Sequence, residues 1–355
     1  MTATPSPTFS IMSPSISPEK SLAVENLRRI RAALPPAAFQ PNPGRLVGMF
    51  LLIAVFLAAH RAVAYAGLSW WLIAPVVVSA VALSAIAFAT HDLAHGSILR
   101  PGRTQRACEL LFWGLVLIAP TVWRRVHNQS HHSSYNTPDD PDRQFLAEES
   151  SPATRWYTWL LYPNAEVFPW NPLVLVHFIP YIVRNTVAAL LPARWKPAFV
   201  PRRADFQAGD AVRIAGELAV ILALQAGLFL LTGGRVLPYL IMAAGTQTLT
   251  SAVTMTYIFT NHFINPLSHE PDPITGTTSV IVPAWIDRFH SNFSYHTEHH
   301  MFPALNSDYY PALSRELRKI YPATYQRIPI GEAWRRLWEN RAFPVSPVGE
   351  VDRAG

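Results

Sequence analysis

The stretch from Trp70 to Ser97, WWLIAPVVVSAVALSAIAFATHDLAHGS, is apolar up to about Thr90 and then carries two histidines. About 20 apolar residues are what a helix needs to cross the hydrocarbon core of a bilayer. His91 and His95 lie four residues apart and continue the helical register, so both imidazoles project from one face at the end of the span. This stretch therefore predicts a membrane helix that ends in a histidine pair.

Three further runs have the same apolar character, and with the first they give four candidate spans at about residues 46–65, 70–90, 214–231 and 236–259. Short turns join the first span to the second and the third to the fourth. The expected fold is an all-α integral membrane protein, with four transmembrane helices in two hairpins and a helical cap that carries the histidines. Of the 29 Lys and Arg residues, all but Arg61 and Arg235 lie on the side of the cap. Basic residues concentrate on the cytoplasmic side of membrane proteins, so we expect a multi-pass protein with a cytoplasmic cap.

The remaining segments divide into tails and interfacial stretches. Residues 1–20 are rich in Ser, Thr and Pro and predict a disordered tail, residues 21–345 form one membrane domain, and residues 346–355 form a C-terminal tail. A short amphipathic helix over residues 21–31 is expected on the membrane surface. The apolar stretches 108–120 and 172–191 are expected to be interfacial or half-buried, since the first is short and the second contains Arg184. Aromatic residues of an interfacial belt lie near them: Trp156, Tyr157, Trp159, Tyr162 and Trp170.

Charge and cysteine content exclude several classes of function. The formal net charge of +6 comes from basic residues scattered between apolar runs, which does not indicate nucleic-acid binding. The single cysteine, Cys108, excludes an internal disulfide, a zinc ion held by several thiolates and a four-thiolate iron–sulfur cluster within one chain. No Gly-rich fingerprint for a flavin or nucleotide is recognisable. Electrons for any redox reaction must therefore come from another molecule.

Eight of the 13 histidines fall in three short clusters, HDLAH, HNQSHH and HTEHH. Each spacing can present two or more imidazoles to one point, and all three clusters lie on the side of the cap. Imidazole without thiolates suits zinc, copper, iron and nickel. The set predicts a nitrogen-rich metal site with these candidate ligands: His91, His95, His127, His131, His132, His296, His299 and His300.

His262 lies alone at the end of the fourth span and is a ninth candidate. Gln247, Ser251 and Thr254 precede it at helical spacing and form a polar stripe, which indicates a site facing the bundle interior. The other histidines have no such neighbours and are expected to be structural, with the last of them a possible partner of a ligand: His60, His177, His269 and His290.

Together these motifs resemble those of the membrane fatty acid desaturases, which carry three histidine boxes around two transmembrane hairpins. The resemblance covers about residues 45–325 and includes HDLAHGS, HHSSYNTPDDPD, HTEHHMFP and YYPALSRELRKIYP. His262 matches the additional histidine that this family places between its second and third boxes. The glutamate-containing boxes of the alkane hydroxylases do not match.

The resemblance implies that the nine histidines ligate two iron ions, which use O2 to introduce a double bond into a fatty acyl chain. It implies an acyl lipid or acyl thioester as substrate and an external electron donor of the ferredoxin or cytochrome b5 type. No catalytic residue beyond the metal ligands is expected. Carboxylates near the boxes could orient ligand rings through their second nitrogens: Asp92, Asp139, Asp140, Asp142 and Glu298.

Two other functions remain open at this point. A diiron site of the same kind could hydroxylate or ketolate a carotenoid or sphingolipid, and the sequence does not separate these outcomes well. A non-enzymatic electron carrier could hold haem between histidine pairs in the bundle, but it requires histidines that face each other in mid-membrane. The acyl chain length, the position of the double bond, the acyl carrier and the oligomeric state are not encoded in any motif that we recognise.

Overall fold

The computed structural model describes residues 18–66, 69–143, 156, 159–163, 171–191 and 206–339. Residues 1–17 of the expected N-terminal tail, the expected C-terminal tail, and Tyr157 and Trp170 of the aromatic belt lie outside these ranges. Within them the chain is mostly helical. Its strands within these ranges form a two-stranded parallel ladder of β1 (Ser279–Ile281) and β2 (Arg327–Pro329).

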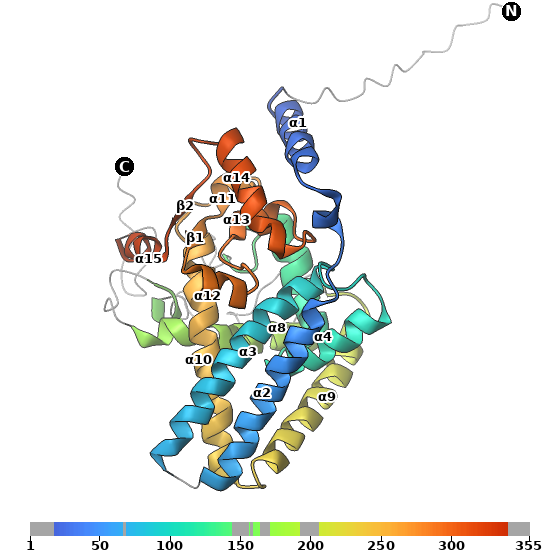
Figure 1. Cartoon of the computed structure of the whole chain (residues 1–355), viewed down its shortest axis with the longest axis vertical. Helices are drawn as coiled ribbons and strands as arrows, with labels where there is room; N and C mark the ends of the chain where they lie inside the picture. Colours follow the sequence, from blue (N-terminus) through green and yellow to red (C-terminus); the bar gives the residue numbers. More distant parts are fainter. Residues whose placement is uncertain are drawn as a thin grey trace, which may run out of the picture.

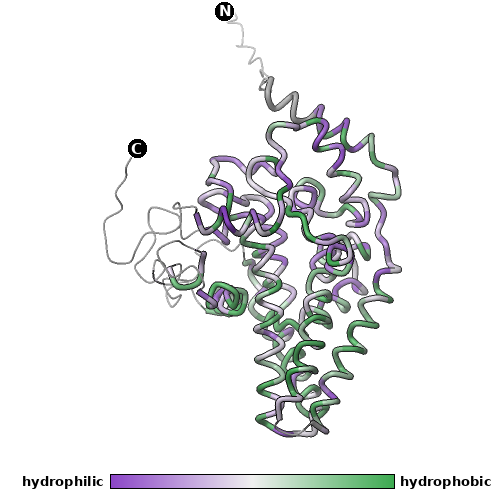
Figure 2. The backbone as a smooth tube through the Cα atoms, turned by 60° about the vertical axis from the view of Figure 1, so that its left-hand side comes forward, coloured by the Kyte–Doolittle hydropathy of each residue, from purple (hydrophilic) through white to green (hydrophobic). Residues whose placement is uncertain are grey.

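Four helices are long and apolar enough to cross a membrane: α2 (Arg45–Ala66), α3 (Ile73–Ala94), α9 (Asp210–Leu231) and α10 (Val236–His262). They run side by side towards one end of the molecule (Figure 1). Figure 2 shows that this end is the hydrophobic part, whereas the other end is mixed. The four predicted spans are therefore confirmed as candidates, and α10 continues beyond its predicted end to His262.

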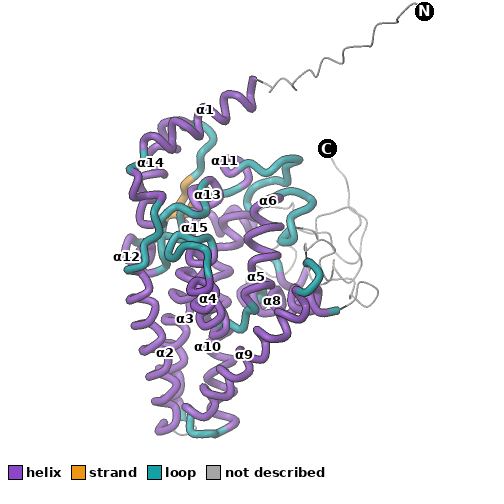
Figure 3. The backbone as a smooth tube through the Cα atoms, turned by 90° about the vertical axis from the view of Figure 1, so that its right-hand side faces the viewer, coloured by secondary structure: helices purple, strands orange, loops and turns teal. Residues whose placement is uncertain are grey.

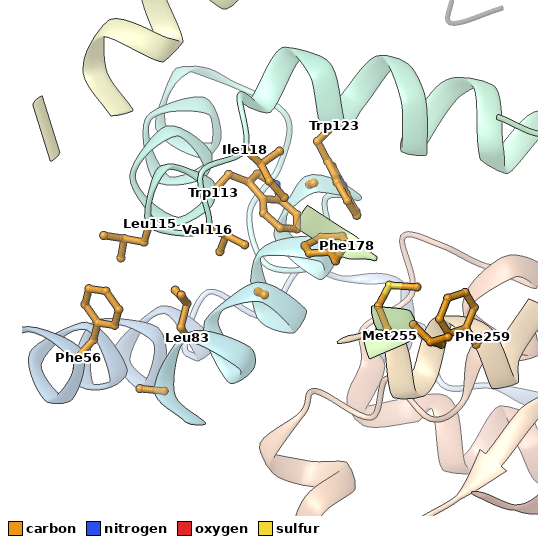
Figure 4. Packing of buried hydrophobic residues seen from close by; sticks show 14 of the residues in the cluster. Phe56, Leu83, Trp113, Leu115, Val116, Ile118, Trp123, Phe178, Met255 and Phe259 are labelled. Atoms are coloured by element: carbon orange, nitrogen blue, oxygen red, sulfur yellow. The ribbon is translucent and has the colours of Figure 1, made fainter. Parts of the chain in front are cut away.

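Helix α3 is the centre of the bundle. It packs against both α2 and α10, and 61% of its apolar span is buried, compared with 28% for α2 and α10 and 17% for α9. At Gly245 of α10 the two backbones approach closely, since a Cβ there would lie 2.8 Å from Cγ1 of Val76. Leu83 of α3 belongs to the main hydrophobic cluster together with Phe56, Trp113 and Met255 (Figure 4).

Two apolar segments enter the bundle without crossing it as a single straight helix. Helix α4 (Arg103–Leu115) is followed by α5 (Pro120–Trp123), η3 (Arg124–His131) and α6 (His132–Ser134), with a bend of 100° between the two parts. The other segment consists of η5 (Pro172–Val176) and α8 (Phe178–Leu190). By length and composition alone, the bent pair would count as a fifth span.

Polar side chains of α10 bind the backbone where these segments break. Gln247 donates a hydrogen bond to the carbonyl of Leu115 at 2.9 Å, and Ser251 donates to the carbonyl of Leu175 at 2.9 Å. A backbone carbonyl that leaves a helix at membrane depth has no water to bind, so it needs a partner from the protein. The expected polar stripe of α10 thus exists, but its first two members support the interrupted segments.

The cap consists of short elements around the ends of α3 and α10. They are α1 (Pro18–Ala33), η1 (Pro36–Phe39), α11 (Pro273–Gly276), α12 (Ala284–Phe289), α13 (His296–Met301), η7 (Ser307–Tyr309), α14 (Tyr310–Ile320) and α15 (Ile330–Glu339). The short helix η2 (Trp70–Leu72) lies instead at the turn between α2 and α3. Ile30 of α1 is buried in one cluster with Leu313 and Leu317 of α14. Figure 3 shows α1 beside α14 at the end of the molecule away from the turns of the spans. Its expected position on the membrane surface stays a prediction.

The close approach of α3 and α10 gives a prediction for stability. Gly245→Ala adds a methyl group against the stiff side chain of Val76, and overpacking of this kind costs about 1–3 kcal/mol. We expect a lower melting temperature for this variant. In the double variant Gly245→Ala/Val76→Ala, the loss of stability should be smaller than the sum of the losses in the two single variants. Gly227→Ala, which meets no atom within 4 Å, is the control and should not lower the melting temperature. Additive effects of the two changes would contradict the contact.

Candidate metal centre

Five histidines from three regions of the chain meet in what we call group one: His91, His95, His127, His132 and His299. Each offers one ring nitrogen, and these nitrogens all lie within 4.8 Å of one another. The Nε2 atom of His127 lies 3.0 Å from that of His91 and 3.3 Å from that of His132. The Nε2 atoms of His132 and His299 are 3.1 Å apart. Group one therefore joins the end of α3, the η3 segment and α13.

The remaining four candidate ligands form group two: His131, His262, His296 and His300. The Nε2 atom of His296 lies 2.6 Å from that of His262 and 3.2 Å from that of His300. A ring nitrogen of His131 lies within 4.8 Å of ring nitrogens of His262 and His300. The two groups touch, because the rings of His132 and His300 stack with centroids 4.5 Å apart.

This arrangement fits two metal ions. Two imidazole nitrogens that bind one ion at about 2.0–2.1 Å lie about 3 Å from each other, as the facing nitrogens do here. At most one proton fits between two facing nitrogens, so hydrogen bonding alone cannot satisfy five converging rings. The Nε2 atoms of His95 and His131 are buried and have no hydrogen-bond partner among the described residues. Burial also lowers the pKa of His299 and of His300 well below the usual value, which favours the neutral form that binds metals.

The helical winding of the second box divides its three histidines between the two groups. The segment Arg124–His131 is a π-helix, in which backbone hydrogen bonds join residues five apart. His127 and His132 are five residues apart and reach the same group, whereas His131 points to the other. In an α-helix a separation of five residues would place two side chains on different faces. The π winding thus explains why three residues separate the first and second histidines of this box, His127 and His131.

Two ligand rings are held through their second nitrogen. Asp140, which is fully buried, accepts from Nδ1 of His131 at 2.9 Å. Nδ1 of His299 lies 3.2 Å from the hydroxyl of Tyr310 on α14. Asp140 also accepts from the backbone N–H groups of Asn136 and Asp142, so the loop after the second box is built around this carboxylate.

The other expected carboxylates have different surroundings. Asp92 lies 3.5 Å from Nδ1 of His91, beyond a normal hydrogen bond, and binds Arg45 and Ser307 instead. Asp142 lies 3.5 Å from Nδ1 of His131. Glu298 accepts from Ser279 and Tyr325 and contacts no ligand ring, and Asp139 is exposed. The sequence thus identified Asp140 among five candidates but gave no role to Tyr310.

The remaining histidines lie apart from the two groups. His60 lies in α2, where its ring contacts the carbonyl of Phe56, and His269 is exposed. His290 contacts the hydroxyl of Tyr257 at 3.0 Å and stacks near Phe88, which brings it close to the groups without joining them. His177 is buried between aromatic rings. The ligands lie at the ends of α3 and α10 and in the cap, so the mid-membrane pairs that a haem carrier requires are not formed by the described residues.

An apolar pocket borders both histidine groups. His91 and His127 of group one line it, as do three members of group two, His131, His262 and His296. The rest of its wall is mainly hydrophobic and includes Ala87, Trp113, Phe178, Met255 and Ile258. Thr254 of the polar stripe also lines it, unlike Gln247 and Ser251. The volume of this pocket is about 50 Å³, and a short alkyl segment in it would lie against the imidazoles of both groups.

Comparison with known protein families gives one match. A family model described as "Fatty acid desaturase" matches residues 68–330, which is more than half of the chain. The match begins just before α3 and ends at the start of α15, so it includes all nine histidines of the two groups.

The two groups predict the effect of removing single ligands. His132→Ala should lower the metal bound by group one, and His300→Ala the metal bound by group two, since each removes one converging nitrogen. His269→Ala is the control, because this ring is exposed and outside both groups. Metal per chain, measured by mass spectrometry of the digested protein, should fall in the first two variants only. Unchanged metal content in both would rule out these groups as the binding site.

The contact between Asp140 and His131 predicts a second effect. Asp140→Asn weakens the hydrogen bond that orients the ring, and loss of such outer partners typically costs about 10- to 100-fold in metal affinity. Asp139→Asn removes a neighbouring but exposed carboxylate and should leave the affinity unchanged. Competition with a chelator of known affinity measures both. Equal affinities in the two variants would show that Asp140 does not support the ligand.

Proposed function

This chain belongs to the fatty acid desaturase family, and we propose that it is a membrane enzyme that introduces a double bond into a fatty acyl chain with O2 as oxidant. The observation that carries the proposal is the apolar pocket whose wall contains imidazoles of both histidine groups. An alkyl C–H bond has no acidic proton and no electrophilic carbon, so acid–base or nucleophilic catalysis cannot attack it. A metal-based oxidant next to an apolar pocket meets this requirement.

The nine histidines of the two groups would hold two iron ions, in keeping with nitrogen-rich sites for this metal. When bound, the iron pair supplies the means to activate O2 for removal of hydrogen from carbon. The reaction balances when two adjacent methylene groups each lose one hydrogen and O2 is reduced to two molecules of water. The substrate provides two electrons, and a one-electron carrier protein provides the other two together with two protons from water.

The chain itself positions the substrate and keeps water out. The pocket wall offers contacts to an alkyl chain through Ala87, Phe178 and Met255, and its polar side chains outside the histidine groups include Asp142, His177, Tyr181 and Thr254. Asp140 and Tyr310 fix the orientation of His131 and His299. A chain held against rigid ligands presents the same carbons at each turnover, which is how a protein directs chemistry that its cofactor performs.

Electron supply and orientation belong to the same proposal. The single thiol of Cys108 cannot hold a redox cluster, so the carrier is external and of the ferredoxin or cytochrome b5 type. The cap with its histidines faces the cytoplasm, because nearly all basic residues lie on that side. The substrate is an acyl lipid or an acyl thioester that reaches the pocket from the membrane.

Blocking the pocket without changing a ligand tests this function. Met255 is buried and lines the pocket, so Met255→Trp should fill the space for the alkyl chain and reduce turnover at least tenfold while the metal content stays at the wild-type level. Leu249→Trp, on an exposed face of the same helix, is the control and should retain turnover. The assay combines purified protein, lipid substrate, O2, NAD(P)H and a reductase with its carrier, and maps double bonds in the product.

Three outcomes would contradict parts of the proposal. Full turnover of Met255→Trp would exclude this pocket as the substrate site. Turnover without any carrier protein would refute the external electron supply. A product that is only hydroxylated would leave the metal centre in place but replace desaturation by hydroxylation.

A further inference from the structure

A second cavity lies outside the catalytic centre, between α4, η3 and α9. Its volume is about 350 Å³, which is within the range of small-ligand sites. Helices α4 and α9 touch at Gly114, where a Cβ would lie 2.9 Å from Cδ1 of Leu224. The residues that line the cavity precede this contact on both helices, from Arg106 to Leu110 on α4 and at Arg213 and Glu217 on α9. Helix α9 begins at Asp210, so Arg213 and Glu217 lie in its first two turns and the cavity lies at the N-terminal end of this candidate span.

Four arginines line this cavity, and two of them are neutralised by carboxylates. Arg124 forms two hydrogen bonds with Glu109, whose side chain is fully buried, and Arg125 binds Asp210 at 2.7 Å. Both carboxylate oxygens of Glu217 accept from Thr121, one from its backbone N–H and one from its hydroxyl.

The other two arginines that line the cavity are Arg106 and Arg213. Both are exposed, and within the described part of the chain the side chain of neither donates a hydrogen bond or forms an ion pair. The cavity therefore presents two guanidinium groups from opposite walls, and guanidinium binds phosphate oxygens with matching geometry.

We propose that this cavity binds the phosphate of an anionic membrane phospholipid between Arg106 and Arg213. A lipid rather than a soluble anion fits the position, because the outer surface of α9 below the cavity is apolar and uncovered. Only 17% of its apolar span is buried, and Val220, two turns beyond Arg213 on the same face of the helix, is 41% exposed. The acyl chains of a lipid whose phosphate sits in the cavity would run along this surface. Basic pockets between membrane helices on the cytoplasmic side attract anionic headgroups in this way.

The cavity is also connected to the candidate metal centre along the chain. Arg124 and Arg125 line the cavity and directly precede Val126 and His127, so the cavity wall is continuous with the π-helical second box. A lipid that contacts both α4 and α9 would stabilise this wall of the cavity. The inference concerns binding of a lipid and does not depend on which reaction the centre performs.

The test measures lipid binding in the intact purified protein. Detergent-solubilised protein is titrated with phosphatidylglycerol, phosphatidylcholine or inorganic phosphate, and its melting temperature is recorded. We expect phosphatidylglycerol to raise the melting temperature by a few degrees, since a ligand that binds only the folded state stabilises it. In the double variant Arg106→Gln/Arg213→Gln, the concentration needed for this rise should increase at least tenfold, since each interfacial arginine contributes about 1 kcal/mol of attraction to an anionic lipid.

The matched control is Arg100→Gln/Arg103→Gln, which removes the same charge from exposed residues beside the same helix that do not line the cavity. It should respond to phosphatidylglycerol like the wild-type protein. An equal response of both double variants would overturn the proposal, because the effect would then be a general attraction of basic residues. A rise of the same size with inorganic phosphate alone would also overturn it, by showing that the site takes a soluble anion. Metal content at the wild-type level in both variants shows that they are folded.

Discussion

Facing imidazole nitrogens about 3 Å apart can share at most one proton, and nine such rings are drawn together here at one end of a membrane bundle. Burying polar atoms without partners costs free energy, so the ring arrangement and the binding of metal must support each other. A metal that binds only the assembled ligands contributes its binding free energy to folding. A bound metal pair would in this way hold together the ends of α3 and α10, the second box and α13.

The polar links around the groups serve the same requirement. Arg45 at the start of α2 donates to Asp92 at 2.8 Å, and Ser307 of the cap donates to the same carboxylate at 2.7 Å. Arg143, which is almost fully buried, donates to the carbonyl of His262, the last residue of α10. Each link joins a membrane helix to a segment that is distant in sequence. In the folded structure these charged groups have polar partners, which offsets part of the cost of their burial.

The candidate spans and the convergence of the nine histidines were predictable because each depends on local pattern: a run of apolar residues of sufficient length, or histidines at helical spacing. The division of the ligands into two groups was not, because it depends on the π winding of η3, which no composition rule predicts. Tyr310 was missed for a related reason. Its contact with His299 arises from the packing of α14 on α13, and the sequence places the two eleven residues apart with a turn between them. Gln247 and Ser251 were recognised as an inward polar stripe, but the carbonyls that they bind belong to breaks whose positions only the tertiary structure defines.

Those two hydrogen bonds also impose an order on assembly during synthesis. The carbonyls of Leu115 and Leu175 belong to segments that emerge from the ribosome well before α10, which supplies both of their partners. Until α10 inserts, entry of either break into the hydrocarbon core would leave its carbonyl without this partner, which disfavours burial of both segments before α10 is present. The last span to be made therefore completes the interior of the bundle, and it brings His262 to the centre in the same step. A nascent chain truncated before α10 would expose these segments to the quality-control proteases of the membrane.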